Sequence, residues 1–407
     1  MSEPASNELI IGRQPIFDRD FKVIAYEVLY RGTKEEADAG KTASVIVEAL
    51  VDVGIENIAG THPLFFNIDA EFLLHETELT QALPPEQVYF EILETVEPTE
   101  AVLAGCQALK DKGYRIALDD VISIDQVKPY IDLLDVIKID WKDAENPAAI
   151  MREFRRYDVR FLAEKVETYE EMEAAKALNA DLYQGYFFCK PQQVKGQKLP
   201  ESKMSILRAM QQAMVATSID QLFEVVRSDV TLSFRLLKYI NSAAFGLRRE
   251  IASIEQALTL LGLNNIRRWL TLLTMTSLGE NKPDELIRQA LWRARFLESV
   301  AKALGEDVVD DDFMMGLFSI LDALLDRSME ESLKEVSLAE HVRNGLIDLS
   351  TPMGQKLAVS FAIEQGEWDV VKAFTEDGRR IAYTDISRMQ AEAMQWADEQ
   401  MSALNSL

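Results

Sequence analysis

The stretch Val136-Ile137-Lys138-Ile139-Asp140 decides how the first half of the chain is interpreted. Three apolar residues accompany a lysine and a carboxylate, as they do where a short buried strand ends. On its own, a lysine near a strand end is most often a solvated residue. Other apolar runs of this half also end in acidic or amide residues, namely Asn67, Glu91, Asp119, Asp120 and Glu164. This recurrence indicates that the strand ends contribute to one site.

Short apolar runs alternate with helical stretches through the first half. The runs 14–17 and 23–30 flank the polar residues Asp18-Arg19-Asp20 and predict a hairpin. Later strand-like runs are 63–68, 88–93, 114–120, 136–140, 159–164 and 182–188, and helical patterns cover 43–53, 98–112 and 169–178. This alternation is typical of repeated βα units with a mainly parallel sheet, which can close into a barrel.

In such a barrel, the carboxyl ends of the strands meet on one rim, where active sites are built. We therefore expect the polar residues at the ends of these runs to lie together. The alternative interpretation, in which each of them only caps its own strand, stays open at this point.

The pattern changes after the polar segment 190–200, which contains two prolines and a glycine and is typical of a linker. Beyond it, apolar residues recur at helical spacing, as in Leu232, Leu236 and Ile240. Ser253 precedes a helical pattern that ends at Gly262. We predict two domains, an α/β barrel at 1–195 and an all-α domain at 196–407.

Composition limits the functions that the chain can have. Among 407 residues, 68 Asp and Glu against 43 Lys and Arg give a net charge of -25, which argues against binding duplex nucleic acid through a basic face. Cys106 and Cys189 are too few for a disulfide framework and fit a reducing compartment. Because neither a secretory signal nor a membrane-length apolar run is visible, we expect a cytoplasmic protein.

The predicted rim is rich in oxygen ligands, whereas the whole chain has three histidines. Hard ions such as Mg²⁺ and Mn²⁺ prefer carboxylate and amide oxygens, while zinc favours histidine and cysteine. A pair of such ions can ionise a water and hold it in line with a phosphodiester. The residues therefore point to phosphoester hydrolysis.

Several motifs resemble the EAL-type cyclic-di-GMP phosphodiesterases. Glu27-Val28-Leu29 stands where that family has its signature tripeptide, and Tyr30-Arg31 follows it. Further landmarks occur in the family's order: Phe66-Asn67, Phe90-Glu91-Ile92-Leu93-Glu94, Asp119-Asp120, Lys138-Ile139-Asp140, Ala163-Glu164-Lys165-Val166-Glu167-Thr168 and Gln184-Gly185-Tyr186. The resemblance covers about the first 190 residues.

The resemblance implies a role for each matched residue. Metal ligands for two Mg²⁺ or Mn²⁺ ions would be Glu27, Asn67, Glu91, Asp119 and Asp120. Catalysis would use Glu27, with Lys138 and Glu164 positioning the attacking water. Arg31 and Gln184 would contact substrate, and Glu94 and Glu167 would support the loop after Asp120. The reaction would open cyclic-di-GMP to linear pGpG, and the family's use of that loop in dimer contacts is compatible with a homodimer.

Two residues and one loop depart from the family pattern. Val28 replaces the alanine of the signature, and Lys165 replaces a glycine beside Glu164. The loop 121–125 has no glycine, although β-branched residues rarely adopt the positive φ that glycine allows.

The second half resembles the HDOD domain, a helical module related to HD-type metal phosphohydrolases. The resemblance is carried by 233–245 and 254–262, but Asp322 has no histidine beside it and His341 is the only histidine after His75. An HD-type metal centre therefore cannot form, which implies a regulatory or protein-binding role. Over nearly its full length the chain resembles bacterial EAL-HDOD signalling proteins.

Three functions remain open from the sequence. The chain could be a phosphodiesterase regulated by its helical domain, a receptor that binds cyclic-di-GMP without hydrolysing it, or a scaffold that acts through protein contacts alone. The first two share a site and differ in the loop that follows Asp120.

Overall fold

The computed structural model describes residues 9–32, 55–75, 80, 83–192, 199–227, 230–242, 251–376 and 381–406. The chain divides into two compact units. The first comprises Met1–Phe188 with Ala362–Trp368 and Tyr383–Arg388, and the second comprises Cys189–Phe361, Asp369–Ala382 and Met389–Leu407. The domain limits 1–195 and 196–407 stay a prediction, and the helix predicted at 43–53 lies outside the described residues.

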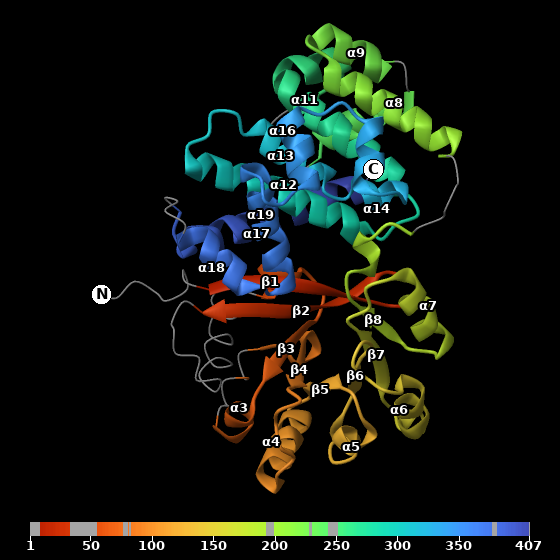
Figure 1. Cartoon of the computed structure of the whole chain (residues 1–407), viewed down its shortest axis with the longest axis vertical. Coiled ribbons are helices and arrows are strands. Elements are labelled where there is room, and N and C mark those ends of the chain that lie inside the picture. The colour runs from red at the N-terminus through yellow and green to blue at the C-terminus, as the bar shows by residue number, and fades with distance from the viewer. Residues whose placement is uncertain are drawn as a thin grey trace. The chain divides into compact units, whose positions relative to one another are not determined.

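Eight strands form a closed barrel in the order β1 to β8 (Figure 1). They are β1 (Leu9–Phe17), β2 (Val23–Gly32), β3 (Leu64–Ile68), β4 (Val88–Ile92), β5 (Arg115–Val121), β6 (Val136–Asp140), β7 (Arg160–Glu164) and β8 (Leu182–Gln184). β1 is antiparallel to both of its neighbours, β2 and β8, and the remaining neighbours are parallel. The predicted TIM-like barrel and its opening hairpin are confirmed.

Helices follow most of the strands and lie on the outside of the barrel in Figure 1. They are α2 (Ile55–Ala59), α3 (Ala70–His75), α4 (Glu100–Asp111), α5 (Ile124–Val127), α6 (Pro147–Phe154) and α7 (Tyr169–Ala177), with short 3₁₀ turns η3 (Pro85–Gln87), η4 (Ile131–Leu133) and η5 (Phe187–Cys189). α4 begins where the Thr99 hydroxyl accepts the Val102 N–H at 3.3 Å. α7 begins at a capping box formed by Thr168 and Glu171.

One prediction in this half was too long. The run 182–188 forms a strand only to Gln184, because Gly185 adopts a φ of 144° that no regular strand contains. The chain then turns into η5, where Phe187 and Phe188 are buried.

The inside of the barrel is filled by an apolar layer to which every strand contributes one residue. The layer consists of Ile16, Ala25, Phe65, Tyr89, Ala117, Val136, Leu162 and Leu182. Phe65 and Tyr89 stack within it, with ring centroids 4.1 Å apart. The barrel is therefore a packed core, and a site has to lie at one of its ends.

The second unit is helical, as predicted. Its elements are α8 (Glu201–Val215), α9 (Ile219–Arg227), α10 (Val230–Ile240), α11 (Ile254–Leu278), α12 (Asp284–Leu304), α13 (Asp310–Phe318), α14 (Leu321–Leu325), α15 (Met329–Ser332), η7 (Leu333–Glu335), α16 (Glu340–Ile347) and most of α17 (Pro352–Gln365), α18 (Trp368–Glu376) and α19 (Tyr383–Asn405). The end of α17 and the beginnings of α18 and α19 belong to the first unit. The Ser253 hydroxyl caps α11, and Gly262 breaks this helix with φ 74° and ψ 170°, where a helix end was predicted. Within the described residues, no helix is both long and apolar enough to cross a membrane.

Candidate active site at the carboxyl end of the barrel

A layer of polar side chains lies directly above the apolar layer. Side chains two residues apart on a strand point to the same face of the sheet, so each strand adds a second inward residue beyond its apolar one. On β2 to β8 these are Glu27, Asn67, Glu91, Asp119, Lys138, Glu164 and Gln184. β1 runs in the opposite direction, so its member, Gln14, lies two residues before Ile16. We call these eight residues the polar ring.

Lys138 is the centre of the polar ring. Its side chain is 0% exposed, and its ammonium lies between four carboxylates. The Nζ atom is 2.6 Å from Glu91 Oε1, 2.7 Å from Asp119 Oδ1, 3.0 Å from Glu27 Oε2 and 3.0 Å from Glu164 Oε1. A buried cation at this position compensates charges that would otherwise repel one another.

Burial and mutual repulsion shift the pKa values in the ring. Burial, followed by the charge of Glu27, raises the pKa of Glu91 well above its usual range. Burial, followed by the charge of Asp119, does the same to the pKa of Glu164. Burial would lower the pKa of Lys138, but the four surrounding carboxylates outweigh it and raise that pKa well above its usual value. The ring therefore favours an added positive charge.

Amide side chains orient Glu27 from two sides. Asn67 Nδ2 donates to Glu27 Oε1 at 3.3 Å, and Gln184 Nε2 donates to Glu27 Oε2 at 2.5 Å. The same Gln184 nitrogen also donates to Gln14 Oε1 at 2.9 Å, which connects β8 with β1. Amides from two other strands therefore fix the orientation of the Glu27 carboxylate.

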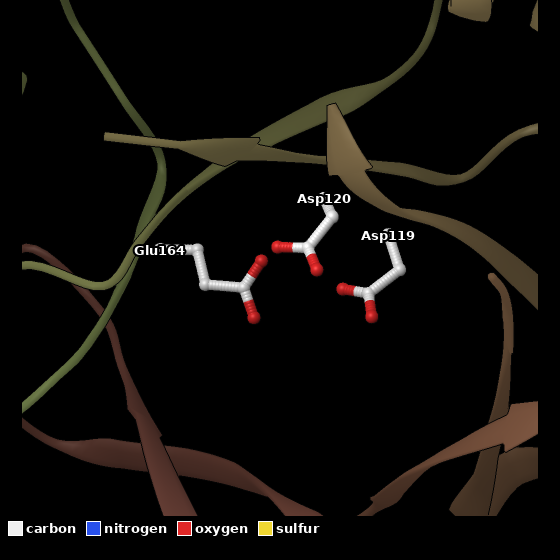
Figure 2. A group of neighbouring side chains, drawn as sticks. All are labelled: Asp119, Asp120 and Glu164. Carbon is white, nitrogen blue, oxygen red and sulfur yellow. The ribbon is translucent and has the colours of Figure 1, made fainter. Parts of the chain in front are cut away.

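Asp120 lies next to two members of the polar ring, although its position in the sequence predicts an outward side chain. The pairing of β5 with β6 shifts between Leu118 and Val121, and Asp120 has a φ of 46°. Such an irregularity redirects a side chain at the end of a strand. Carboxylate oxygens of Asp119, Asp120 and Glu164 lie within 4.8 Å of one another, and Figure 2 shows the three groups pointing toward one another.

Lys165 lies on the outer side of this cluster. It directly follows β7 and has a φ of 56°, in the left-handed region. Its Nζ atom donates to Asp120 Oδ1 at 2.5 Å and to Asp140 Oδ2 at 2.6 Å. Burial would raise the pKa of Asp140, but hydrogen bonds from Lys165 and from the backbone N–H groups of Asp143 and Lys142 outweigh it and lower that pKa.

The loop after Asp120 is short and needs no glycine in this structure. None of the described residues 121–124 has a positive φ. The N–H groups of Ile122 and Ser123 both donate to Gln126 Oε1 at 2.9 Å, and α5 starts directly afterwards. The residue that adopts a left-handed conformation is Asp120 itself.

Three further predicted residues are not members of the polar ring. Arg31 is on β2, but its side chain is outside the described part of the structure. Glu94 is exposed just after β4, and no hydrogen bond joins it to the described loop after Asp120. Glu167 is half-buried and its carboxylate pairs with Lys142, while its N–H donates to Glu171 Oε2 at 2.7 Å. Their roles stay predictions.

The donor set fits a hard divalent ion. Buried oxygens without a hydrogen-bond partner among the described residues include Asn67 Oδ1, Glu91 Oε2, Glu164 Oε2 and Gln184 Oε1. Buried polar atoms of this kind are rare unless they serve a ligand. In the part of the chain that the structure describes, the carboxylates of Asp119, Asp120 and Glu164 are the one cluster of three or more metal-type ligands. Oxygen donors of this kind suit Mg²⁺ or Mn²⁺.

Two contributors were given no role from the sequence. Gln14 was missed because β1 is antiparallel, so its inward residue precedes the apolar one; its register partner is Glu27. Asp140 was predicted only as the last residue of a strand. Its hydrogen bond from Lys165 depends on the left-handed backbone at Lys165, which the sequence does not reveal. The period of two along β1 was the only available signal for Gln14.

Comparison with known proteins identifies both halves of the chain. The family models of the EAL domain and the HDOD domain match residues 3–191 and 197–346. The uncharacterized protein YuxH of Bacillus subtilis is 30% identical over 97% of this chain and 99% of its own. The cyclic di-GMP phosphodiesterase CdgJ of Vibrio cholerae is 30% identical over 96% of this chain and 92% of its own.

Among solved structures, an EAL domain protein from Listeria monocytogenes is similar to 45% of this chain and 89% of its own, at 21% identity and a TM-score of 0.38. The two full-length relatives and the two ordered domain models decide the classification. The chain belongs to the EAL–HDOD family, in which an EAL domain is followed by an HDOD domain.

Proposed function

We propose that the chain is a metal-dependent phosphodiesterase that opens cyclic-di-GMP to linear pGpG. The observation that carries this proposal is the polar ring, in which carboxylates from four strands surround Lys138 at the end of the barrel. The relative CdgJ, which is 30% identical over nearly the whole chain, is named as a cyclic di-GMP phosphodiesterase and supports the choice of substrate.

The proposed metal ligands are Glu27, Asn67, Glu91, Asp119 and Asp120. A pair of Mg²⁺ or Mn²⁺ ions would supply the acidity that converts a bound water into a nucleophile at neutral pH. The buried oxygens of Asn67 and Glu91 that lack hydrogen bonds support this assignment.

The protein side chains then position the reacting groups. Lys138 holds one oxygen of Glu164 at 3.0 Å, and the other oxygen, Oε2, has no hydrogen-bond partner among the described residues, so Glu164 can accept from an attacking water and orient it. Glu27 is oriented by Gln184, which faces the same space, and we assign Gln184 and Arg31 to the substrate. Glu94 and Glu167 are proposed to support the neighbouring loop.

A hydrolysis assay on the full chain tests the proposal. Purified protein with Mg²⁺ or Mn²⁺ is expected to produce pGpG, and chelation with EDTA should stop the reaction. Glu27→Ala should lower kcat by at least about 100-fold, because it removes a group at the reacting centre. The matched control is Glu153→Ala, since Glu153 is an exposed carboxylate near the end of the outer helix α6. Absence of turnover with both metals would contradict the proposal.

A second candidate is a cyclic-di-GMP receptor with negligible turnover. It is favoured by Lys165, whose ammonium pairs with Asp120, one of the proposed metal ligands. Calorimetric binding of cyclic-di-GMP at micromolar concentration, combined with no pGpG in the assay above, would support the receptor.

We also propose that the HDOD domain regulates the barrel through protein contacts and that the chain acts in the cytoplasm. A homodimer is a further proposal, which is compatible with the family. Sedimentation of the full chain, with and without cyclic-di-GMP, would report the oligomeric state.

A further inference from the structure

Lys165 adopts a backbone conformation that an ordinary side chain avoids. Its φ of 56° lies in the left-handed region, which is unfavourable for a residue with a Cβ. Such conformations persist where the surroundings stabilise them, and they cluster at functional sites. The structure around Lys165 therefore offsets this strain, and its side-chain contacts are part of that structure.

Those contacts hold the ammonium between two carboxylates. Asp140 is 2% exposed, and the N–H groups of Lys142 and Asp143 fix its Oδ1 atom at 2.8 and 2.9 Å. Its other oxygen, Oδ2, accepts from Lys165 at 2.6 Å. Asp140 is thus a rigid acceptor that aims the ammonium at Asp120, 2.5 Å away.

Asp120 is also a member of the three-carboxylate cluster. Its oxygen lies within 4.8 Å of ligand atoms of Asp119 and Glu164, and those two carboxylates are contacted by Lys138 rather than by Lys165. The two lysines therefore divide the acidic site between them. Lys138 compensates the interior of the ring, and Lys165 compensates the edge at Asp120.

We infer that Lys165 is an internal cation that competes with the second divalent ion for Asp120. The inference rests on the proposed metal site. One ion binds tightly inside the ring, whereas a second ion has to displace an ammonium that is already paired with Asp120 and Asp140. The side chain is 42% exposed, so the ammonium can leave toward solvent when a second ion binds.

The test is a titration of the full chain with Mn²⁺ alone, in which calorimetry reports each site and the EPR signal of free Mn²⁺ gives the number bound. Wild type is expected to bind one ion tightly and a second one at least about tenfold more weakly. Lys165→Met removes the charge and keeps the left-handed strain. It should therefore strengthen the second site at least about tenfold and leave the first unchanged.

Three further variants separate charge from backbone effects. Lys165→Gly removes both charge and strain and should match Lys165→Met, while Lys165→Arg keeps a cation and should match wild type. Lys142→Met is the control, because Lys142 is an exposed lysine near the site that pairs with Glu167. It should change neither metal affinity.

Two outcomes would overturn the inference and leave the metal site intact. One is equal affinity for two ions in wild type, and the other is an effect of Lys165→Gly that Lys165→Met lacks. If neither wild type nor any variant binds Mn²⁺, the proposed metal site itself is wrong, and the inference fails with it.

Discussion

At the scale of single residues, Lys138 is the buried cation that pairs with four carboxylates of the barrel. It is fully buried, and its ammonium lies within 3.0 Å of four carboxylates. Removing one partner from a buried charge network is costly because the remaining charges lose their compensation. Lys138 therefore contributes to the stability of the fold, independently of its proposed role in catalysis.

Lys138→Met is expected to lower the free energy of unfolding of the metal-free protein by about 3–5 kcal/mol. Thermal unfolding with and without Mn²⁺ measures this loss, and added Mn²⁺ should restore part of it, since a bound ion supplies the missing positive charge. Lys142→Met removes an exposed ion pair and should cost under about 1 kcal/mol. Equal melting temperatures for the two variants would show that the ring does not need its central cation.

How much of the site could be predicted also depends on single residues. Glu27, Asn67, Glu91, Lys138 and Glu164 follow from the period of two along parallel strands and the order of the motifs. Asp120 was expected in the site, but its inward direction requires a shifted register and a φ of 46°, which local sequence does not encode. Gln14 was missed because the residue pattern does not reveal that β1 runs antiparallel to β8. The helices at 98–112 and 169–178 were found because their caps and periodicity are local.

At the scale of elements, the junction of β7 and β8 fixes the carboxyl edge of the site. Gly185 follows β8 with a φ of 144°, and the Val166 N–H donates to the Gln184 carbonyl oxygen at 3.0 Å. A Cβ on Gly185 would collide with the backbone of Val166. Two neighbouring strand ends, which carry Glu164 and Gln184, therefore depend on one residue without a side chain.

Gly185→Ala is expected to destabilise the protein by more than about 2 kcal/mol, because backbone strain and a backbone collision add. Gly60→Ala is the matched control: its φ is 61°, but a Cβ there has nothing within 4 Å, so it should cost only about 1 kcal/mol. Denaturant unfolding of both variants measures the difference. Equal losses in the free energy of unfolding would mean that the backbone of Val166 moves aside without cost.

At the scale of the whole molecule, a buried carboxyl group in the helical unit, Asp312, makes the stability of the protein depend on pH. Burial raises the pKa of Asp312 to about 6, against an ordinary value of 3.8, and the ion pair with Lys356 at 2.5 Å only partly opposes this. The folded protein therefore binds this proton more tightly than the unfolded chain does. By linkage, the contribution of Asp312 to stability rises as pH falls through 6 and levels off near 4.

Lowering the pH from 7.5 to 5 should stabilise wild type by about 1 kcal/mol relative to Asp312→Asn, which cannot titrate. Unfolding curves of both proteins at a series of pH values give the comparison, and groups that titrate elsewhere cancel in the difference. The control is Glu340→Gln, because Glu340 is exposed. Its free energy of unfolding should change with pH in parallel with that of wild type. Parallel curves for Asp312→Asn would contradict the shifted pKa.

Closure of the barrel depends on a contact between distant parts of the chain. β1 pairs with β8 through Ile16 and Gln184, so closure joins residues 168 positions apart (184 − 16). Contacts between distant residues form slowly because a long loop must close before they form. During synthesis, Glu27 emerges from the ribosome long before Gln184 can orient it. A nascent chain that stops before β8 therefore contains every acidic residue of the site but lacks the hydrogen bond from Gln184 to Glu27.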